Sequence, residues 1–170
     1  MASVWLDTLY EVIKSEATAP PDAARIYGVV AVALYEAIAP GSRRNQSLVG
    51  QLNDLSSVPR PESDKKHHWA TAANAALAQT IRGIFPSLTP DNRTAIDTLE
   101  ASFAARFQDV LPNHAYQRSV TYGRAVAEAI LAWAEGDGYS TFANIRTLAY
   151  QLWRAPPRPA RSGWTAIEHH

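Results

Sequence analysis

The stretch APPDAARIYGVVAVALYEAIAP, residues 19–40, decides the fold class. Two prolines open it, and a long apolar run with few charged residues follows. Prolines suit the first turn of a helix because their missing amide donors are not needed there, and Asp22 complements the positive end of the helix dipole. Pro40 and Gly41 are typical of a helix end. The stretch therefore predicts one helix.

The apolar part of this helix is short for a membrane span. It runs from Ile26 to Ile38, about a dozen residues, whereas a span needs roughly 20. One face carries apolar residues at spacings of three and four: Ile26, Val29, Val30, Ala33, Leu34 and Ala37. The opposite side is apolar as well, at Ala31, Val32 and Tyr35. We therefore expect no membrane span, but a core helix that its neighbours cover on most sides.

Apolar periodicity and helix-end residues predict four further helices. The first covers residues 4–16, with Ser3 as its cap. Another covers residues 64–85 and ends before Pro86, and the next begins at Pro90 after the cap Thr89. The last is capped by Asn113 and ends at the glycines that follow Glu135.

Strand signals are nearly absent, so the sequence predicts an all-α protein. We expect a single bundle of about five helices over residues 1–138 and an irregular segment rich in proline and tryptophan over residues 139–170. Residues 41–64 read as a long irregular connection. Five apolar residues would hold this connection to the bundle: Leu48, Val49, Leu52, Leu55 and Val58.

Composition excludes several classes of function. The chain has 170 residues, with 16 basic and 16 acidic side chains, so no overall field attracts nucleic acid or an anionic membrane. It has no cysteine, which excludes disulfides, thiolate nucleophiles and cysteine-based metal sites. No signal peptide is visible at the start, so the sequence is compatible with the cytoplasm and with export after processing.

The histidines and carboxylates do not form the patterns that are typical of a metal site or of a catalytic pair. His67 and His68 are adjacent and would point about 100° apart on a helix, whereas helical metal ligands are spaced three or four apart, so we expect a solvated helix start and no metal site. His114 lies beside an expected cap and should be a surface residue. Asp97 and Glu100 share a helix face that should be solvated.

The C-terminal segment holds the strongest candidates for a contact site. Trp153 and Trp164 would be costly apolar surface if nothing covered them. Arg154, Arg158 and Arg161 lie among the prolines and could contact an anion or the carboxylates of a partner. Packing of this segment on the bundle is the simpler interpretation.

The order of several segments resembles a known family. A tryptophan-bearing first helix is followed by residues 19–40, an Asn- and Arg-rich connection, an alanine-rich helix ending in IFP, and WRAPPRPARSGW. This order is similar to the N-terminal helical half of the bacterial vanadium-dependent haloperoxidases and their relatives in the type 2 phosphatidic acid phosphatase superfamily. In that family the second helix commonly reads Pro-Pro, Ala-Ala-Arg and then Tyr-Asp-Ala. Here Arg25 and Tyr35 match, and Glu36 replaces the aspartate.

The resemblance implies an all-helical fold whose second half carries an oxyanion site. That site would combine Lys and Arg residues with a Pro-Ser-Gly-His loop, whose histidine attacks phosphate or binds vanadate. The lysines of this chain, Lys14, Lys65 and Lys66, are not followed by Arg-Pro at the family spacing. Its one Ser-Gly pair is followed by Trp164 instead of histidine. We therefore expect no catalytic residue and no cofactor here, with vanadate or phosphate bound only when the missing half is present.

Three functions remain open. The first is the scaffold part of a haloperoxidase-like or acid phosphatase-like protein, inactive alone, whose partner is a C-terminal catalytic half that continues or docks near Trp153 and Trp164. The second is a stand-alone interaction protein that forms a homodimer or binds a partner helix. The third is a small helical enzyme that uses His67 or His114.

Overall fold

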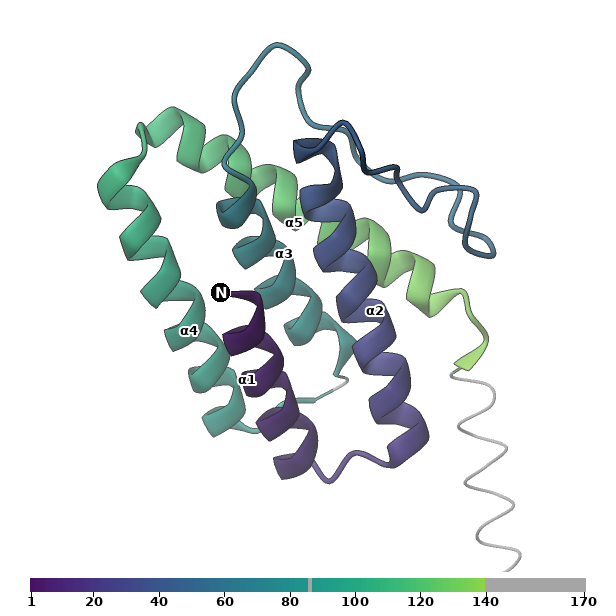
Figure 1. Ribbon diagram of the computed structural model, residues 1–170. Helices are drawn as coiled ribbons and strands as arrows, with labels where there is room; N and C mark the ends of the chain where they lie inside the picture. Colours follow the sequence, from purple (N-terminus) through teal and green to yellow (C-terminus); the bar gives the residue numbers. More distant parts are fainter. Residues whose placement is uncertain (86, 140–170) are drawn as a thin grey trace, which may run out of the picture. The chain divides into compact units, whose positions relative to one another are not determined.

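The computed structural model describes residues 1–85 and 87–139, and these residues form helices without any strand. Five α-helices and one short 3-10 helix, η1, follow one another along the chain (Figure 1). Their bounds are Ala2–Ser15 for α1, Pro20–Ile38 for α2, Ala39–Gly41 for η1, Trp69–Ile84 for α3, Pro90–Val110 for α4 and Asn113–Glu135 for α5. The prediction of an all-α bundle of about five helices is confirmed. Met1–Asp137 form one compact unit.

Helix α3 is the central element, because it packs against α2, α4 and α5. Most of its residues are buried, and many of them are alanine. Small side chains let the backbones come close: a Cβ atom added to Gly123 of α5 would lie 2.1 Å from the carbonyl oxygen of Ala72. Helices α3 and α5 therefore meet almost backbone to backbone.

Helix α2 covers one side of α3, and the expectation that its neighbours cover it on most sides is wrong. The predicted core face is largely correct, because Ile26, Val30 and Ala33 are buried. On the other side of the helix, Ala24, Gly28 and Ala31 are exposed. These residues are apolar but small, so leaving them exposed to water costs little compared with exposing Leu or Ile.

The apolar residues of the bundle form two clusters. One joins α1 to α3 and α4 and contains Trp5, Leu9 and Ile81. The other joins α2, α3 and α5 and receives the irregular connection that runs from η1 to α3. All five apolar residues expected to hold that connection are part of the second cluster: Leu48, Val49, Leu52, Leu55 and Val58.

Three expected helix starts differ from the structure. Helix α3 begins at Trp69 instead of residue 64, because the ring Nδ1 of His68 accepts the amide hydrogen of Thr71 at 3.3 Å and caps the helix. Helix α1 begins at Ala2, so Ser3 lies inside it. Helix α5 begins at Asn113, and the preceding proline takes the cap position.

Within the described residues, one segment is long and apolar enough to cross a bilayer, Pro20–Gly41. This segment has 22 residues and is longer than its apolar part, residues 26–38. Its length alone therefore does not distinguish a bilayer from the interior of a protein. Core helices of proteins pass the same test, and α2 packs on α3 and α5. Its charged residues Arg25 and Glu36 are both bonded within the protein.

Candidate functional site

The five residues predicted to contact an anion or partner lie outside the described residues. They are Trp153, Arg154, Arg158, Arg161 and Trp164. The predicted irregular C-terminal segment falls in the same part of the chain from residue 140 onward. These assignments stay predictions, and the candidate site is built from the helical bundle.

Arg25, which carries part of the family resemblance, ties the start of α2 to the end of α5. Its Nε donates to Oδ2 of Asp137 at 2.7 Å, and its Nη2 donates to the carbonyl oxygen of Ala134 at 2.6 Å. The last carbonyls of a helix lack intrahelical donors and favour a cation. Arg25 therefore has a structural role in this bundle.

Glu36 and Tyr35 hold the irregular connection against α2. The carboxylate of Glu36 is buried and accepts hydrogen bonds from the Leu48 amide at 2.6 Å and the Ser47 hydroxyl at 2.9 Å. The Tyr35 hydroxyl donates to the carbonyl oxygen of Gln46 at 2.8 Å. A buried carboxylate with two donors is a stable local anchor. The matched position Tyr35 and the substituted position Glu36 thus fix a loop here.

The Tyr122 hydroxyl lies beside this anchor and donates to the carbonyl oxygen of Glu36 at 3.1 Å. Burial, together with the charge of Glu36, raises the pKa of Tyr122 to about 12. The phenol therefore stays protonated at neutral pH and acts as a hydrogen-bond donor.

Asp97 and Glu100 are joined by Arg82 of α3 and do not form a catalytic carboxylate pair. Nη2 of Arg82 lies 2.6 Å from Asp97 and 2.5 Å from Glu100. Burial acts to lower the pKa of Arg82, but the hydrogen bonds to the two carboxylates outweigh it and the pKa is raised. The expectation of a solvated face holds for Asp97, whose side chain is 54% exposed, and is wrong for Glu100, at 18%.

Sequence reasoning missed Asn74, a buried polar residue in the alanine-rich α3. Its Oδ1 accepts from the indole nitrogen of Trp5 at 3.0 Å, and its Nδ2 donates to the carbonyl oxygen of Glu100 at 3.1 Å. One side chain thus joins α1, α3 and α4. A single asparagine within an alanine run was the available signal.

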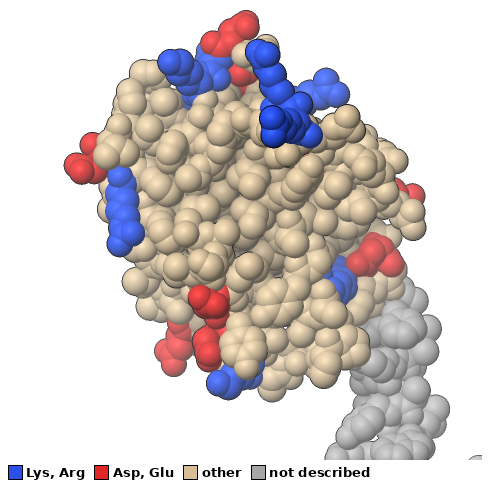
Figure 2. Space-filling view, in the orientation of Figure 1, with Lys and Arg blue, Asp and Glu red and all other residues tan. Residues whose placement is uncertain are grey.

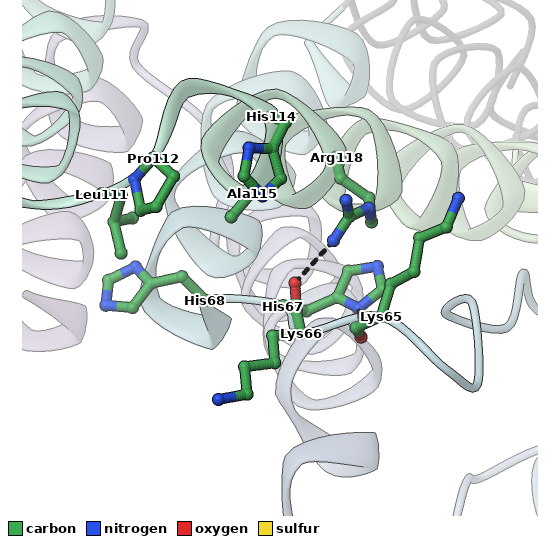
Figure 3. Close-up of a pocket in the computed structure, with 9 residues that line it drawn as sticks. All are labelled: Lys65, Lys66, His67, His68, Leu111, Pro112, His114, Ala115 and Arg118. Atoms are coloured by element: carbon green, nitrogen blue, oxygen red, sulfur yellow. Dashed lines mark hydrogen bonds between the residues drawn. The ribbon is translucent and has the colours of Figure 1, made fainter.

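A basic pocket of about 490 Å³ lies between the loop that precedes α3 and the start of α5 (Figure 3). Its lining is Lys65, Lys66, His67, His68, Leu111, Pro112, His114, Ala115 and Arg118. Six of these residues are basic or titratable, and none of the described lining residues is acidic. His114 is exposed, as predicted.

The loop of the basic pocket is fastened to its surroundings by specific contacts. Nη1 of Arg118 donates to the carbonyl oxygen of Lys66 at 2.9 Å (Figure 3). The ring of His67 stacks on Trp69 with centroids 5.6 Å apart, and the His68 amide donates to the Ser119 hydroxyl at 2.8 Å. The loop is therefore held in place before any ligand binds.

A second pocket of about 350 Å³ adjoins the basic pocket and shares His67 and Arg118 with it. Arg60 and Glu62 line this adjoining pocket. Glu62 pairs with Lys65, and that contact lowers the pKa of Glu62 with a smaller contribution from Arg118. In Figure 2, basic side chains, with acidic ones among them, gather at the end of the molecule where the loop rises above α3 and α5 in Figure 1.

The two pockets can hold an anion, but they do not resemble a metal site. Across the described ranges, no three His, Cys, Asp or Glu side chains lie close enough together to hold a metal ion. His67 packs on Trp69 and Tyr122, whereas the ring of His68 packs on Phe107. The adjacent histidines therefore point into different surroundings.

Comparison with solved structures adds a relationship for the bundle. The chain is similar to the crystal structure described as the first bacterial vanadium-dependent iodoperoxidase, with 26% sequence identity and a TM-score of 0.72. The match covers 82% of this chain and 32% of that one, so the chain spans about a third of the length of the iodoperoxidase. No family model matches the chain. No curated protein matches it either. The bundle thus has a vanadium haloperoxidase-like fold.

Proposed function

We propose that this chain is the scaffold part of a vanadium haloperoxidase-like or acid phosphatase-like protein and has no catalytic activity by itself. The observation that carries the proposal is the unequal coverage of the structural match. Most of this chain matches a bacterial vanadium iodoperoxidase, but only about a third of that enzyme is represented. A part of that size supplies helices that support an active site built largely from other residues.

The chemistry of oxyanions supports inactivity. A multiply charged oxyanion needs several preorganised donors, and each lost donor can cost about 10²–10³ in rate. The Lys, Arg-Pro and Pro-Ser-Gly-His motifs that the resemblance implies are missing from these 170 residues. The basic pocket does not replace them, because Lys65 and Lys66 are exposed and His68 already caps α3. We therefore assign vanadate or phosphate chemistry only to a complete protein.

The surface of α1 and α2 supports a role in assembly with further structure. Ala24, Gly28 and Ala31 form an uncharged exposed stripe on α2, and Leu6 and Tyr10 are exposed one turn apart on α1. In Figure 2 the middle of this face carries few charged side chains. Exposed apolar side chains that lie together on a helix face, as Leu6 and Tyr10 do, occur at contact regions.

A phosphatase assay tests the proposal. The purified chain should hydrolyse p-nitrophenyl phosphate no faster than buffer, and an intact acid phosphatase serves as the positive control. Turnover that rises with the amount of chain would overthrow the proposal. Reading the DNA directly downstream of this reading frame gives an independent check, because a Pro-Ser-Gly-His motif encoded there would supply the missing loop.

A stand-alone interaction protein is the second candidate, and the exposure of Leu6 and Tyr10 favours it. Tyr10 is 55% exposed and Leu6 is 39% exposed. Under this alternative the chain forms a homodimer through an apolar surface. Light scattering distinguishes the two readings. A stable dimer that Tyr10→Asp or Trp153→Ala converts to a monomer would favour the alternative, and a monomer at all concentrations would exclude obligate dimerisation.

A further inference from the structure

Positive charge is concentrated around the basic pocket and the adjoining pocket, although the chain has no net charge. Four permanent cations line the two pockets: Arg60, Lys65, Lys66 and Arg118. Among the described lining residues, Glu62 supplies the only carboxylate, and it pairs with Lys65 and with Arg118. Concentrated like charge in a hollow attracts counter-ions from solution. This corner is therefore suited to an anion with more than one negative charge.

Arg118 lies where the two pockets join. Its side chain is 18% exposed, and its Nη1 is fixed by the carbonyl oxygen of Lys66. Its Nε also lies 3.7 Å from the carboxylate of Glu62. A guanidinium has five N–H donors in a planar fork, so these two contacts leave the donors of Nη2 for a ligand. Carboxylate and phosphate match the fork best, and the side chain is already ordered. Arg118 is thus prepared to bind an oxyanion between the pockets.

We propose that the two pockets together bind a small ligand with two linked phosphate groups, of the diphosphate class. One phosphate would lie near Lys66 and His114, and the other near Arg60, with Arg118 between them. Helix α5 begins at Asn113, beside the first position, and its N-terminal end adds partial positive charge. The proposal concerns anion binding alone. It does not depend on the scaffold function proposed above.

Calorimetry on the full chain at low ionic strength tests the proposal, with diphosphate, orthophosphate and sulfate as probes. Diphosphate should bind at least roughly tenfold more tightly than the other two, because only it reaches both groups of cations. Added salt should weaken binding, since the cations near the surface are screened. Equal affinity for all three anions, or no binding of diphosphate, would overturn the proposal.

Charge-reversal variants locate the site. Lys66→Glu and Arg60→Glu each change one pocket and leave Arg118 in place, and each should weaken diphosphate binding roughly tenfold. Arg93→Glu is the matched control, because Arg93 is exposed in the first turn of α4, at the other end of that helix from Leu111. If Arg93→Glu weakens binding as much as the pocket variants, the assignment is wrong.

Nuclear magnetic resonance of the unmodified chain keeps the test independent of variant folding. Diphosphate should shift the resonances of His67, His114 and Arg118 and leave those of Arg93 unchanged. Shifts confined to residues outside the two pockets would contradict the proposal. Failure here would leave the scaffold proposal intact, because that proposal is tested by turnover and not by anion binding.

Discussion

Gly28 and Gly123 show how one residue type serves opposite purposes in this bundle. A Cβ atom added to Gly28 meets nothing within 4 Å, because this position faces solvent on α2. A glycine inside a helix costs about 1 kcal/mol relative to alanine. Gly28→Ala should therefore stabilise the chain by up to about 1 kcal/mol in urea denaturation. If the Gly28→Ala variant is no more stable than the parent chain, the surroundings of position 28 are not open solvent.

Gly123 should respond in the opposite direction. Gly123→Ala places a methyl group against the backbone of Ala72, which cannot move without separating α3 from α5. Overpacking of this kind typically costs about 1–3 kcal/mol. The free energy of unfolding should fall by at least that amount, and a variant as stable as the parent chain would refute the close contact between the two helices.

Tyr122 predicts a loss of stability in alkali. Its pKa is about 12 in the folded chain, against an ordinary value of 10.0. A raised pKa contributes stability that is fully present below pH 10 and is lost as the pH rises toward 12. The full difference is on the order of 3 kcal/mol.

The variant Tyr122→Phe isolates this effect. It should be less stable at neutral pH by about 1 kcal/mol, because the hydrogen bond to Glu36 is lost, but its stability should fall less steeply above pH 10. Tyr10→Phe is the control, since Tyr10 is largely exposed. Parallel alkaline curves for the parent chain and Tyr122→Phe would contradict the account.

At the scale of single residues, the sequence indicated which side chains were unusual but not what they bind. Glu36 and Asn74 stand out in apolar surroundings. Asn74 bonds to Trp5, which is 69 residues away, and such a partner depends on how the helices cross. The pocket around Arg118 was missed for the same reason, because its lining comes from two segments about fifty residues apart.

At the scale of elements, Glu16 connects the end of α1 to the start of α4. Its Oε1 accepts from the Thr89 amide at 2.8 Å and from Asn92 Nδ2 at 2.7 Å. The hydrogen bond from Asn92, followed by that from the Thr89 amide, lowers the pKa of Glu16 below its ordinary value of 4.5. This contact contributes stability above pH 4.5 that is lost as the pH falls through the lowered pKa.

Glu16→Gln should therefore reduce the urea midpoint at neutral pH, and the difference from the parent chain should shrink in acid. Glu11→Gln is the matched control, because Glu11 is exposed on the same helix and pairs with Lys14. If the Glu16→Gln difference stays constant down to strong acid, the charge of Glu16 is not the cause.

The sequence predicted that the helices exist, but it did not predict every helix start or how exposed each helix is. Apolar periodicity and proline placement identified all five helices, since both depend on local sequence. The start of α3 was missed because the cap is the imidazole of His68, an unusual capping group. The expectation that neighbours cover α2 on most sides was wrong because apolar content does not determine exposure, as Ala24 and Ala31 show.

At the scale of the whole molecule, the bundle is a well-packed body that represents about a third of a known enzyme's length. Two apolar clusters hold it together, and its charges balance overall while one corner is strongly basic. Under the scaffold proposal, these helices position residues that lie outside the bundle. The central claim is that the fold is haloperoxidase-like and the reaction belongs to residues beyond this bundle.

Iodide oxidation by the purified chain, supplied with vanadate and hydrogen peroxide, tests this claim most directly. The account predicts a rate equal to that of the same mixture without protein, while an intact vanadium haloperoxidase gives rapid turnover under the same conditions. A rate that rises in proportion to the chain and disappears when vanadate is left out would contradict the account.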